Sequence, residues 1–342
     1  MTPIDTLPKA FLDRARKKPG RTAMRWKHLG IWRDITWSEY LEKVKRVALG
    51  FHALGVRRGD HVAIIGENKP EWLYCAFGAM CSGAVYVGIY TTSPAKECEY
   101  VVGHSESVVY LCEDEEQFDK ALEFRDNTPA LRKMIVWDME GLRHFHDPML
   151  MSFDDLLALG RKTDEENPGL FLDLIHRTRP EDTAGIIYTS GTTGMPKGAM
   201  LTQEGYLWMG QKVCQVARIT EDDETISFLP LNHIFEQIFD FLVHIAIGHV
   251  INFTENTDTV MSDMKDISPT IFHAVPRIWE KYHSSIIIRM DDATWFKRLA
   301  YRTAIRIGTA YNDLALSGQR PSLPLAAAYR LASFAVFRKL KK

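Results

Sequence analysis

From Thr36 onward, helical segments alternate with short apolar segments, and no other feature of the sequence restricts the fold as much. The first helix is expected to begin at a capping box formed by Thr36 and Glu39 and to end at Gly55. Further helices are expected at residues 70–82, from residue 94, and at residues 115–125, 203–216, 235–247 and 276–289. Short apolar strands are expected at residues 61–65, 84–89, 108–111, 134–137, 185–189, 199–202, 225–229, 249–253 and 270–275. Strands that helices separate pair in parallel, so the pattern predicts an α/β fold of parallel sheets flanked by helices.

The alternation weakens between residues 138 and 181, where a polar stretch ends in Asn167-Pro168-Gly169. Such a break is typical of a junction between compact regions. It predicts two subdomains, residues 1–165 with a first α/β sheet and residues 175–342 with a second.

Composition and charge exclude several classes of protein. The 42 basic and 44 acidic side chains give a formal net charge of -2, so nucleic acid is not an expected partner. The five cysteines form no C-x-x-C pair, which indicates reduced thiols, and the charged residues between 9 and 18 argue against a signal peptide. The uncharged stretch 72–95 contains three glycines and a proline, so a buried helix and strand explain it better than a membrane span. Together these features predict a cytoplasmic protein.

The segment most informative about function runs from Tyr188 to Gly198 and reads Tyr-Thr-Ser-Gly-Thr-Thr-Gly-Met-Pro-Lys-Gly. It lies between two apolar strands and holds four hydroxyl side chains besides the tyrosine, three glycines and one lysine. Glycines let backbone N–H groups converge on an anion, hydroxyls add donors, and Lys197 adds a positive charge. This composition favours a polyphosphate ligand over the alternative, a flexible surface loop.

Other phosphate and catalytic motifs are missing from the sequence. No Gly-Lys dipeptide occurs, which excludes a Walker A loop, and no G-x-G triplet occurs, which excludes the dinucleotide fingerprint. The sequence also contains neither G-x-S-x-G nor H-E-x-x-H. The spacing of His233 and Glu236 could suggest metal ligation, but one such pair lacks the further ligands of a zinc site.

The Tyr188–Gly198 segment resembles the signature phosphate loop of the adenylate-forming (AMP-binding) enzymes. Two further stretches, 229–237 (Leu-Pro-Leu-Asn-His-Ile-Phe-Glu-Gln) and 275–282 (Val-Pro-Arg-Ile-Trp-Glu-Lys-Tyr), are similar to segments of the long-chain acyl-CoA synthetases. Residues 66–72 and 83–90 fit the same group. The resemblance covers nearly the whole chain and implies the large N-terminal domain of such an enzyme.

The resemblance implies a two-step reaction, in which a fatty acid attacks ATP to form an acyl-adenylate and the thiol of coenzyme A then displaces AMP. Lys197 and His233 are the implied catalytic residues, although His233 could instead simply cap the helix that follows. Thr189 would help to hold Mg2+. The residues implied to bind the phosphates of ATP are Thr189, Ser190, Gly191, Thr192, Thr193, Gly194 and Lys197.

The sequence departs from the family after the Val-Pro-Arg stretch. It contains no aromatic-Gly-x-Thr-Glu motif, no Thr-Gly-Asp and no lid with a catalytic lysine, so we expect an incomplete N-terminal domain without the small C-terminal lid domain. Three alternatives stay open: the front half of the enzyme, a non-catalytic binding remnant or scaffold, and adenylation of a different carboxylic acid. A homodimer or a separate C-terminal half would be a partner. Residues 325–342 form an amphipathic pattern with a cationic end, which suits peripheral membrane contact or an apolar face that another domain covers.

Overall fold

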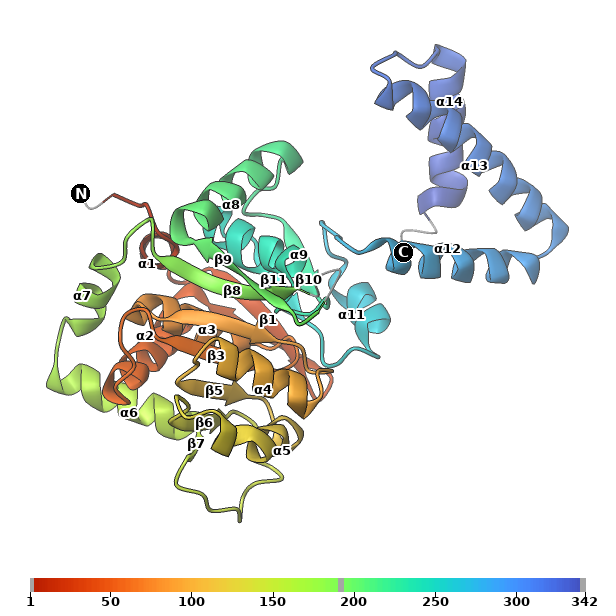
Figure 1. Ribbon diagram of the computed structural model, residues 1–342. Helices are drawn as coiled ribbons and strands as arrows, with labels where there is room; N and C mark the ends of the chain where they lie inside the picture. The colour runs from red at the N-terminus through yellow and green to blue at the C-terminus, as the bar shows by residue number, and fades with distance from the viewer. Residues whose placement is uncertain (1–2, 190–193, 339–342) are drawn as a thin grey trace. The chain divides into compact units, whose positions relative to one another are not determined.

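The computed structural model describes residues 3–189 and 194–338, which divide into two compact units, Met1–Phe272 and His273–Lys342 (Figure 1). The first unit holds every described strand of the chain. The second unit consists of helices.

A seven-stranded sheet forms the centre of the first unit, with the strand order β7-β6-β5-β3-β4-β8-β9. All neighbouring pairs are parallel except β8 and β9, which are antiparallel. The alternation of helices and apolar strands therefore predicted most of the pairing, and the last strand is the exception. The strands are β3 (His61–Ile65), β4 (Val85–Ile89), β5 (Val109–Cys112), β6 (Lys133–Val136), β7 (Leu150–Ser152), β8 (Thr183–Thr189) and β9 (Lys197–Thr202).

Helices cover both faces of this sheet. Alternate residues of a strand face opposite sides, and in this sheet the residues on both sides are apolar and need to be buried. In β3, Val62 and Ile64 belong to one buried cluster, while Ala63 and Ile65 belong to the other. The first cluster packs under α1 (Leu7–Lys17), α2 (Trp37–Ala53), α3 (Pro70–Ser82), α6 (Phe153–Glu166) and α7 (Leu170–His176). The second cluster packs under α4 (Ala95–His104) and α5 (Glu115–Phe124).

A second, four-stranded sheet has the order β10-β11-β1-β2. Its strands β1 (Thr22–His28) and β2 (Ile31–Thr36) form an antiparallel hairpin across Leu29 and Gly30, whose φ angles are 48° and 76°. β10 (Glu224–Ser227) and β11 (Val250–Phe253) pair in parallel, and the segment between them contains α9 (Ile234–Gln237), a π-helical turn at Ile238–Val243 and α10 (His244–Ile247). α8 (Gln203–Ala217) precedes β10, and α11 (Val260–Ile267) follows β11.

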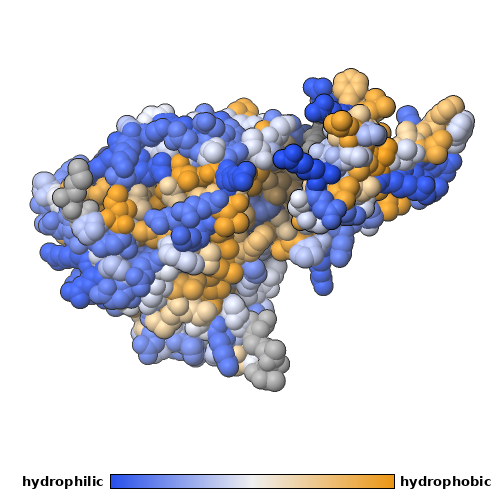
Figure 2. All heavy atoms as spheres, turned by 90° about the horizontal axis from the view of Figure 1, so that it is seen from above, coloured by the Kyte–Doolittle hydropathy of each residue, from blue (hydrophilic) through white to orange (hydrophobic). Residues whose placement is uncertain are grey.

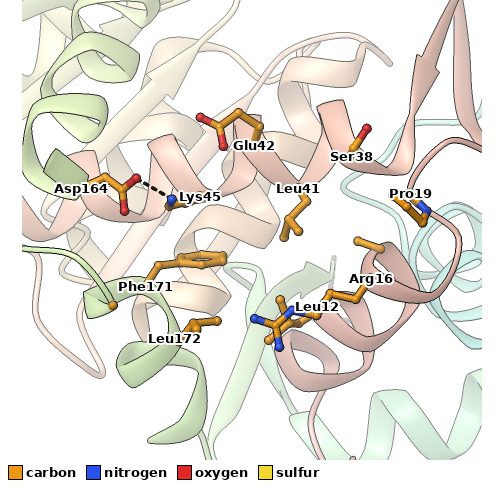
Figure 3. A pocket seen from close by; sticks show the side chains of 12 residues that line it. Leu12, Arg16, Pro19, Ser38, Leu41, Glu42, Lys45, Asp164, Phe171 and Leu172 are labelled. Atoms are coloured by element: carbon orange, nitrogen blue, oxygen red, sulfur yellow. Dashed lines mark ion pairs between the residues drawn. The ribbon is translucent and has the colours of Figure 1, made fainter.

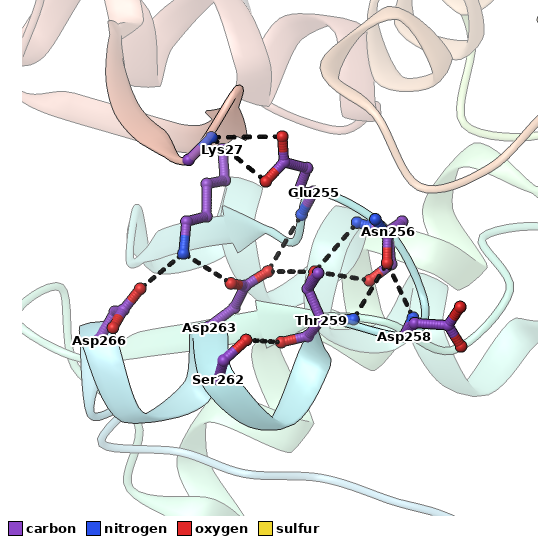
Figure 4. A network of polar contacts seen from close by, with 9 residues as sticks. Lys27, Glu255, Asn256, Asp258, Thr259, Ser262, Asp263 and Asp266 are labelled. Carbon is purple, nitrogen blue, oxygen red and sulfur yellow. Dashed lines mark hydrogen bonds and ion pairs between the residues drawn. The ribbon is translucent and has the colours of Figure 1, made fainter.

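A buried ion pair joins α11 to β1 (Figure 4). The Lys27 ammonium lies 2.8 Å from an oxygen of Asp263 and 2.6 Å from an oxygen of Asp266. The Asp263 carboxylate is fully buried and also accepts hydrogen bonds from the Glu255 N–H (3.1 Å) and the Thr259 hydroxyl (2.7 Å). The hydrogen bonds that Lys27 donates to Asp263 and Asp266 favour its charged form and raise the pKa of its ammonium. The buried Asp263 carboxylate therefore has a cation, Lys27, to balance its charge and two hydrogen-bond donors, from Glu255 and Thr259.

The second unit contains α12 (Pro276–Asp291), α13 (Trp295–Leu316), α14 (Leu323–Ala332) and a π-helical turn at Ser333–Phe337. α13 and α14 pack through the stacked rings of Tyr311 and Tyr329, whose centroids are 4.1 Å apart. Many large apolar side chains of this unit stay exposed, and Figure 2 shows hydrophobic side chains at its surface. No helix within residues 3–189 and 194–338 combines the length and the hydrophobicity that crossing a membrane requires.

Most of the predicted elements are confirmed, including the capping box at Thr36 and Glu39 and the helix over residues 70–82, which ends at a left-handed Gly83. The stretch 72–95 is the buried helix α3 followed by the buried strand β4. The four cysteines before residue 113 are buried, Cys214 is partly buried, and all five are free thiols.

The strand predicted at residues 270–275 is wrong. Thr270 and Ile271 each donate a backbone hydrogen bond to the Glu224 carbonyl at the edge of the second sheet. Residues 271–275 do not go on to pair with β10 as a strand. Prolines at positions 269 and 276 flank this segment and donate no backbone hydrogen bond. The strands β1, β2 and β7 were not predicted.

The predicted division at residues 165–175 falls inside the first unit. Strands from both sides of it share one sheet, because β8 pairs with β4. The chain instead divides into its two compact units between Phe272 and His273.

Candidate functional site

The segment predicted to bind phosphate, Tyr188–Gly198, runs from the end of β8 to the start of β9, and these two strands are antiparallel. Thr189, the last residue of β8, lies opposite Lys197, the first residue of β9, and both are exposed. Gly194 has a φ of 102°, in the region that glycine enters without strain. The structure therefore brings Thr189, Gly194 and Lys197 to the two ends of one connection. Ser190, Gly191, Thr192 and Thr193 lie outside the described residues.

This connection begins at the carboxyl edge of the seven-stranded sheet, because β8 is parallel to β4 and β3 (Figure 1). The segments 66–69 and 90–94 leave the sheet at the same edge, after β3 and β4. In open α/β sheets, ligands bind outside the carboxyl ends of the strands. The phosphate-binding prediction thus falls at the edge where such a fold binds ligands.

The side chain of Asn68, in the segment after β3, forms hydrogen bonds with the chain around Leu229. Its Nδ2 donates to the Ser227 hydroxyl at 2.8 Å and to the Leu229 carbonyl at 2.7 Å. Its Oδ1 accepts a hydrogen bond from the Leu231 N–H at 3.2 Å. Two stretches that resemble the family therefore meet in space, although about 160 positions separate them in the sequence.

The same 229–237 segment rests on β4. A side chain at Gly88 would place its Cβ 2.7 Å from the Cβ of Asn232, so only glycine allows this approach. Behind it, the Gln237 Oε1 accepts hydrogen bonds from the hydroxyls of Tyr86 and Tyr206, each at 2.8 Å, and these two hydroxyls lie 2.6 Å apart. All three side chains are buried, so their hydrogen bonds fix the position of the segment relative to β4 and α8.

His233 is exposed at the start of α9 and caps this helix. Its Nδ1 accepts a hydrogen bond from the Phe235 N–H at 3.1 Å. The helix-cap alternative therefore describes one role that the residue plays. His233 comes from a different segment than Thr189 and Lys197, and no described hydrogen bond or ion pair joins it to either of them. Its catalytic role stays a prediction.

The Glu236 side chain is buried, whereas the His233 side chain is exposed. The Glu236 carboxyl is fully buried and accepts a hydrogen bond from the Phe228 N–H at 3.0 Å. Burial raises its pKa from 4.5 to about 8, although the hydrogen bonds that it accepts oppose this shift. Sequence reasoning considered Glu236 only as a metal ligand, because the burial of a carboxyl within a short helix has no signature in the sequence. No cluster of metal-ligating side chains was found in the described part of the chain.

We expect the stability of the protein to fall as the pH rises from about 5 to about 8, because of Glu236. In this range the folded protein keeps a proton that the unfolded chain has released, so unfolding loses a proton and the free energy of unfolding decreases with pH. Glu236→Gln, which cannot ionise, should gain stability relative to the parent by up to about 1.4 kcal/mol per pH unit. Urea unfolding of both proteins at pH 5, 6.5 and 8 measures this difference. A difference that is constant across the three pH values would show that Glu236 ionises normally.

A separate cavity of about 370 Å³ lies between α1, α2 and α7, near the end of α6 (Figure 3). Leu12, Leu41 and Phe171 form apolar walls, and Lys45 forms an ion pair with Asp164 at the rim. None of the predicted site residues lines this cavity. We therefore place the candidate site at the β8–β9 connection and not here.

Comparison with known proteins extends these observations. A family model described as AMP-binding enzyme matches residues 11–323. The human protein named long-chain-fatty-acid–CoA ligase ACSBG2 is 32% identical over an alignment of 344 positions, which covers 99% of this chain and 50% of the human protein. The protein of the same name from Rattus norvegicus is 31% identical, over 99% of this chain and 51% of its own length.

Among solved structures, a long-chain-fatty-acid-CoA ligase (FadD1) from Archaeoglobus fulgidus superposes with a TM-score of 0.65 at 20% sequence identity. The match covers 79% of this chain and 51% of that chain. The shared fold agrees with the predicted α/β architecture. The chain spans about half the length of the curated relatives that it matches.

Proposed function

Since the chain belongs to the AMP-binding enzyme family, we propose that it takes part in the ATP-dependent activation of a long-chain fatty acid, first to an acyl-adenylate and then to the acyl-CoA. The observation that carries this proposal is the β8–β9 connection. Thr189 and Lys197 are opposite each other in the antiparallel ladder, and the sequence that joins them is rich in Ser, Thr and Gly. The names of the relatives support a long-chain fatty acid as the substrate.

In the first step, the carboxylate of the fatty acid attacks the α-phosphorus of ATP, and the bond to pyrophosphate breaks. The protein supplies no nucleophile, so its contribution is to align the phosphates and to stabilise negative charge on the leaving pyrophosphate. The exposed ammonium of Lys197 is suited to this role, and the backbone N–H groups of the connection would add donors. In the second step the thiol of coenzyme A displaces AMP from the acyl carbonyl.

Thr189 fits a site for Mg2+ that is shared with the phosphates. Its exposed hydroxyl stands at the carboxyl end of β8, and hydroxyl oxygen is the kind of ligand that Mg2+ accepts. When bound, Mg2+ would neutralise phosphate charge. We also propose that His233, exposed at the start of α9, lines the place where the acyl group, the nucleotide and the thiol meet.

Carboxylate-dependent exchange of labelled pyrophosphate into ATP tests the proposal, with a panel of acids from acetate to palmitate. We expect exchange to peak with a long-chain acid, either with the chain alone or after adding a separate chain that supplies the Thr-Gly-Asp and lid elements. Preference for an amino or aryl acid would favour the alternative substrate. A folded protein that binds ATP but never exchanges would favour the non-catalytic binding remnant or scaffold.

The second unit supports a further proposal, that the protein contacts an anionic membrane surface from the cytoplasm. Residues 273–342 contain 13 Lys or Arg and 4 Asp or Glu, although the whole chain has a net charge of -2. Trp295, Phe296 and Phe334 are among its exposed apolar side chains. Basic and exposed apolar residues together favour binding at the surface of anionic lipid.

Sedimentation with lipid vesicles distinguishes this surface from an apolar face that a homodimer partner or a separate C-terminal half covers. We expect the protein to sediment with vesicles that contain anionic lipid and to be released by 0.5 M salt, because salt screens the charges. Equal binding to neutral vesicles, or dimer formation that abolishes vesicle binding, would favour the covered face.

A further inference from the structure

Helix α4 contacts both arms of the β8–β9 connection. We call the residues at the end of β8, Tyr188–Thr189, the first arm, and the residues that lead into β9, Pro196–Gly198, the second arm. On the first arm, the Tyr188 hydroxyl lies 2.7 Å from the Nδ1 of His104. On the second arm, which enters β9, the carbonyl of Pro196, the last residue of the connection, accepts a hydrogen bond from the Tyr100 hydroxyl at 3.0 Å. His104 and Tyr100 are one turn apart on α4. One turn of this helix therefore forms hydrogen bonds with a side chain of the first arm and with the backbone of the second.

The rings of these three residues also pack against one another. Tyr100 stacks on His104 with a centroid distance of 5.2 Å, and the Tyr188 ring meets both of them edge-on, at 6.3 Å and 5.8 Å. Tyr188 is only 9% exposed, and burial raises its pKa to about 12. The contact with His104 therefore lies in a largely buried setting, where little water competes for the hydroxyl.

The Tyr188 ring is held from the side of β9 as well. Tyr188 lies opposite Gly198 in the antiparallel ladder, and a Cβ at Gly198 would come within 3.2 Å of the Tyr188 ring and 2.7 Å of the Ile186 side chain. Gly198 thus lets the ring lie over β9. The ring is enclosed between β9 and α4, which leaves it little freedom to move.

We propose that Tyr100, His104 and Tyr188 are positioning residues, which together form an aromatic clamp that fixes the two arms of the phosphate-binding connection relative to each other. This inference rests on the proposed function, because it assigns the clamp to the binding of a polyphosphate. Residues that fix a binding segment before the ligand arrives reduce the ordering cost of binding.

Single-atom variants test the clamp. Tyr100→Phe removes only the hydroxyl that binds the Pro196 carbonyl, and Tyr188→Phe removes only the hydroxyl that binds His104. Tyr74→Phe is the matched control, since it removes a tyrosine hydroxyl from α3, where the ring packs against Tyr40 of α2. We expect each clamp variant to bind Mg2+-pyrophosphate roughly 3- to 10-fold more weakly, as the loss of one hydrogen bond allows, and the control to bind like the parent.

A second measurement needs no ligand. Trypsin cleaves after Lys197, which stands on the arm that Tyr100 holds, and we expect Tyr100→Phe to accelerate cleavage there several-fold relative to cleavage after Lys162 on α6. Thermal melting of all variants should agree within about 2 °C, because one partly buried hydrogen bond contributes little to global stability.

The two measurements separate failure of the clamp from failure of the proposed function. A parent protein that does not bind pyrophosphate would contradict the proposed function, while faster cleavage at Lys197 in Tyr100→Phe would still support the clamp. Unchanged pyrophosphate affinity together with unchanged cleavage at Lys197 would overturn the clamp.

Discussion

Lys197→Ala is expected to weaken the binding of Mg2+-pyrophosphate by roughly 10- to 100-fold, because hydrogen bonds to charged groups are among the strongest that a side chain makes. Lys197 is the only lysine or arginine between Arg179 and Lys212, so no neighbouring residue of the segment can replace its charge. Its side chain is exposed, and within residues 3–189 and 194–338 it takes part in no ion pair. The melting temperature should therefore stay within about 2 °C of the parent value, since exposed substitutions rarely change stability. Isothermal titration with Mg2+-pyrophosphate and a thermal melt measure the two quantities.

Two further variants control this prediction. Lys212→Ala removes an exposed lysine from α8 and should leave pyrophosphate affinity unchanged. Lys197→Arg keeps the charge and should recover most of the affinity. Unchanged affinity in Lys197→Ala would contradict the assignment of this segment as the phosphate loop.

Lys27→Met is expected to destabilise the first unit by about 3 kcal/mol, because it leaves the Asp263 carboxylate buried without its cation. Asp263 has no exposed surface, and Lys27 is its one basic partner among the described residues. Hydrogen bonds from the Glu255 N–H and the Thr259 hydroxyl remain, which is why we expect the lower end of the range for a broken buried pair. Urea unfolding monitored by tryptophan fluorescence measures the change in the free energy of unfolding.

The double variant and a neighbouring lysine make this test specific. Lys27→Met combined with Asp263→Leu should be less destabilised than Lys27→Met alone, because no buried charge is left without a partner. Lys265→Met changes an exposed lysine of α11, the helix that carries Asp263, and should alter the free energy of unfolding by less than about 0.5 kcal/mol. A loss in Lys27→Met no larger than that of Lys265→Met would show that the pair contributes nothing.

Much of the fold could be predicted from the sequence because it is written in local patterns. Apart from the partly buried His61, the strands at residues 61–65 and 84–89 are buried on both faces, so they form continuous apolar runs that stand out between amphipathic helices. The capping box at Thr36 and the left-handed glycine at Gly83 mark helix ends by chemistry that involves only a few neighbouring residues.

The elements that escaped prediction lack such patterns. β2 is mostly exposed or partly buried, and β7 has three residues, so neither shows a run of buried side chains. The antiparallel direction of β9 depends on a connection of seven residues, 190–196, which is too short for the crossover that a parallel strand requires. That length was available in the sequence and could have corrected the prediction.

The sequence by itself determined the residue types of the candidate site and the family, because the segment predicted to bind phosphate is contiguous, so its hydroxyls, glycines and lysine can be recognised without knowing what contacts them. Only the tertiary structure decided what surrounds that segment. The hydrogen bonds from Tyr100 and His104 to the two arms cross 96 and 84 positions, and the pair of Lys27 with Asp263 crosses 236. Contacts over such separations follow from the order of the strands and from close packing, which no local propensity encodes.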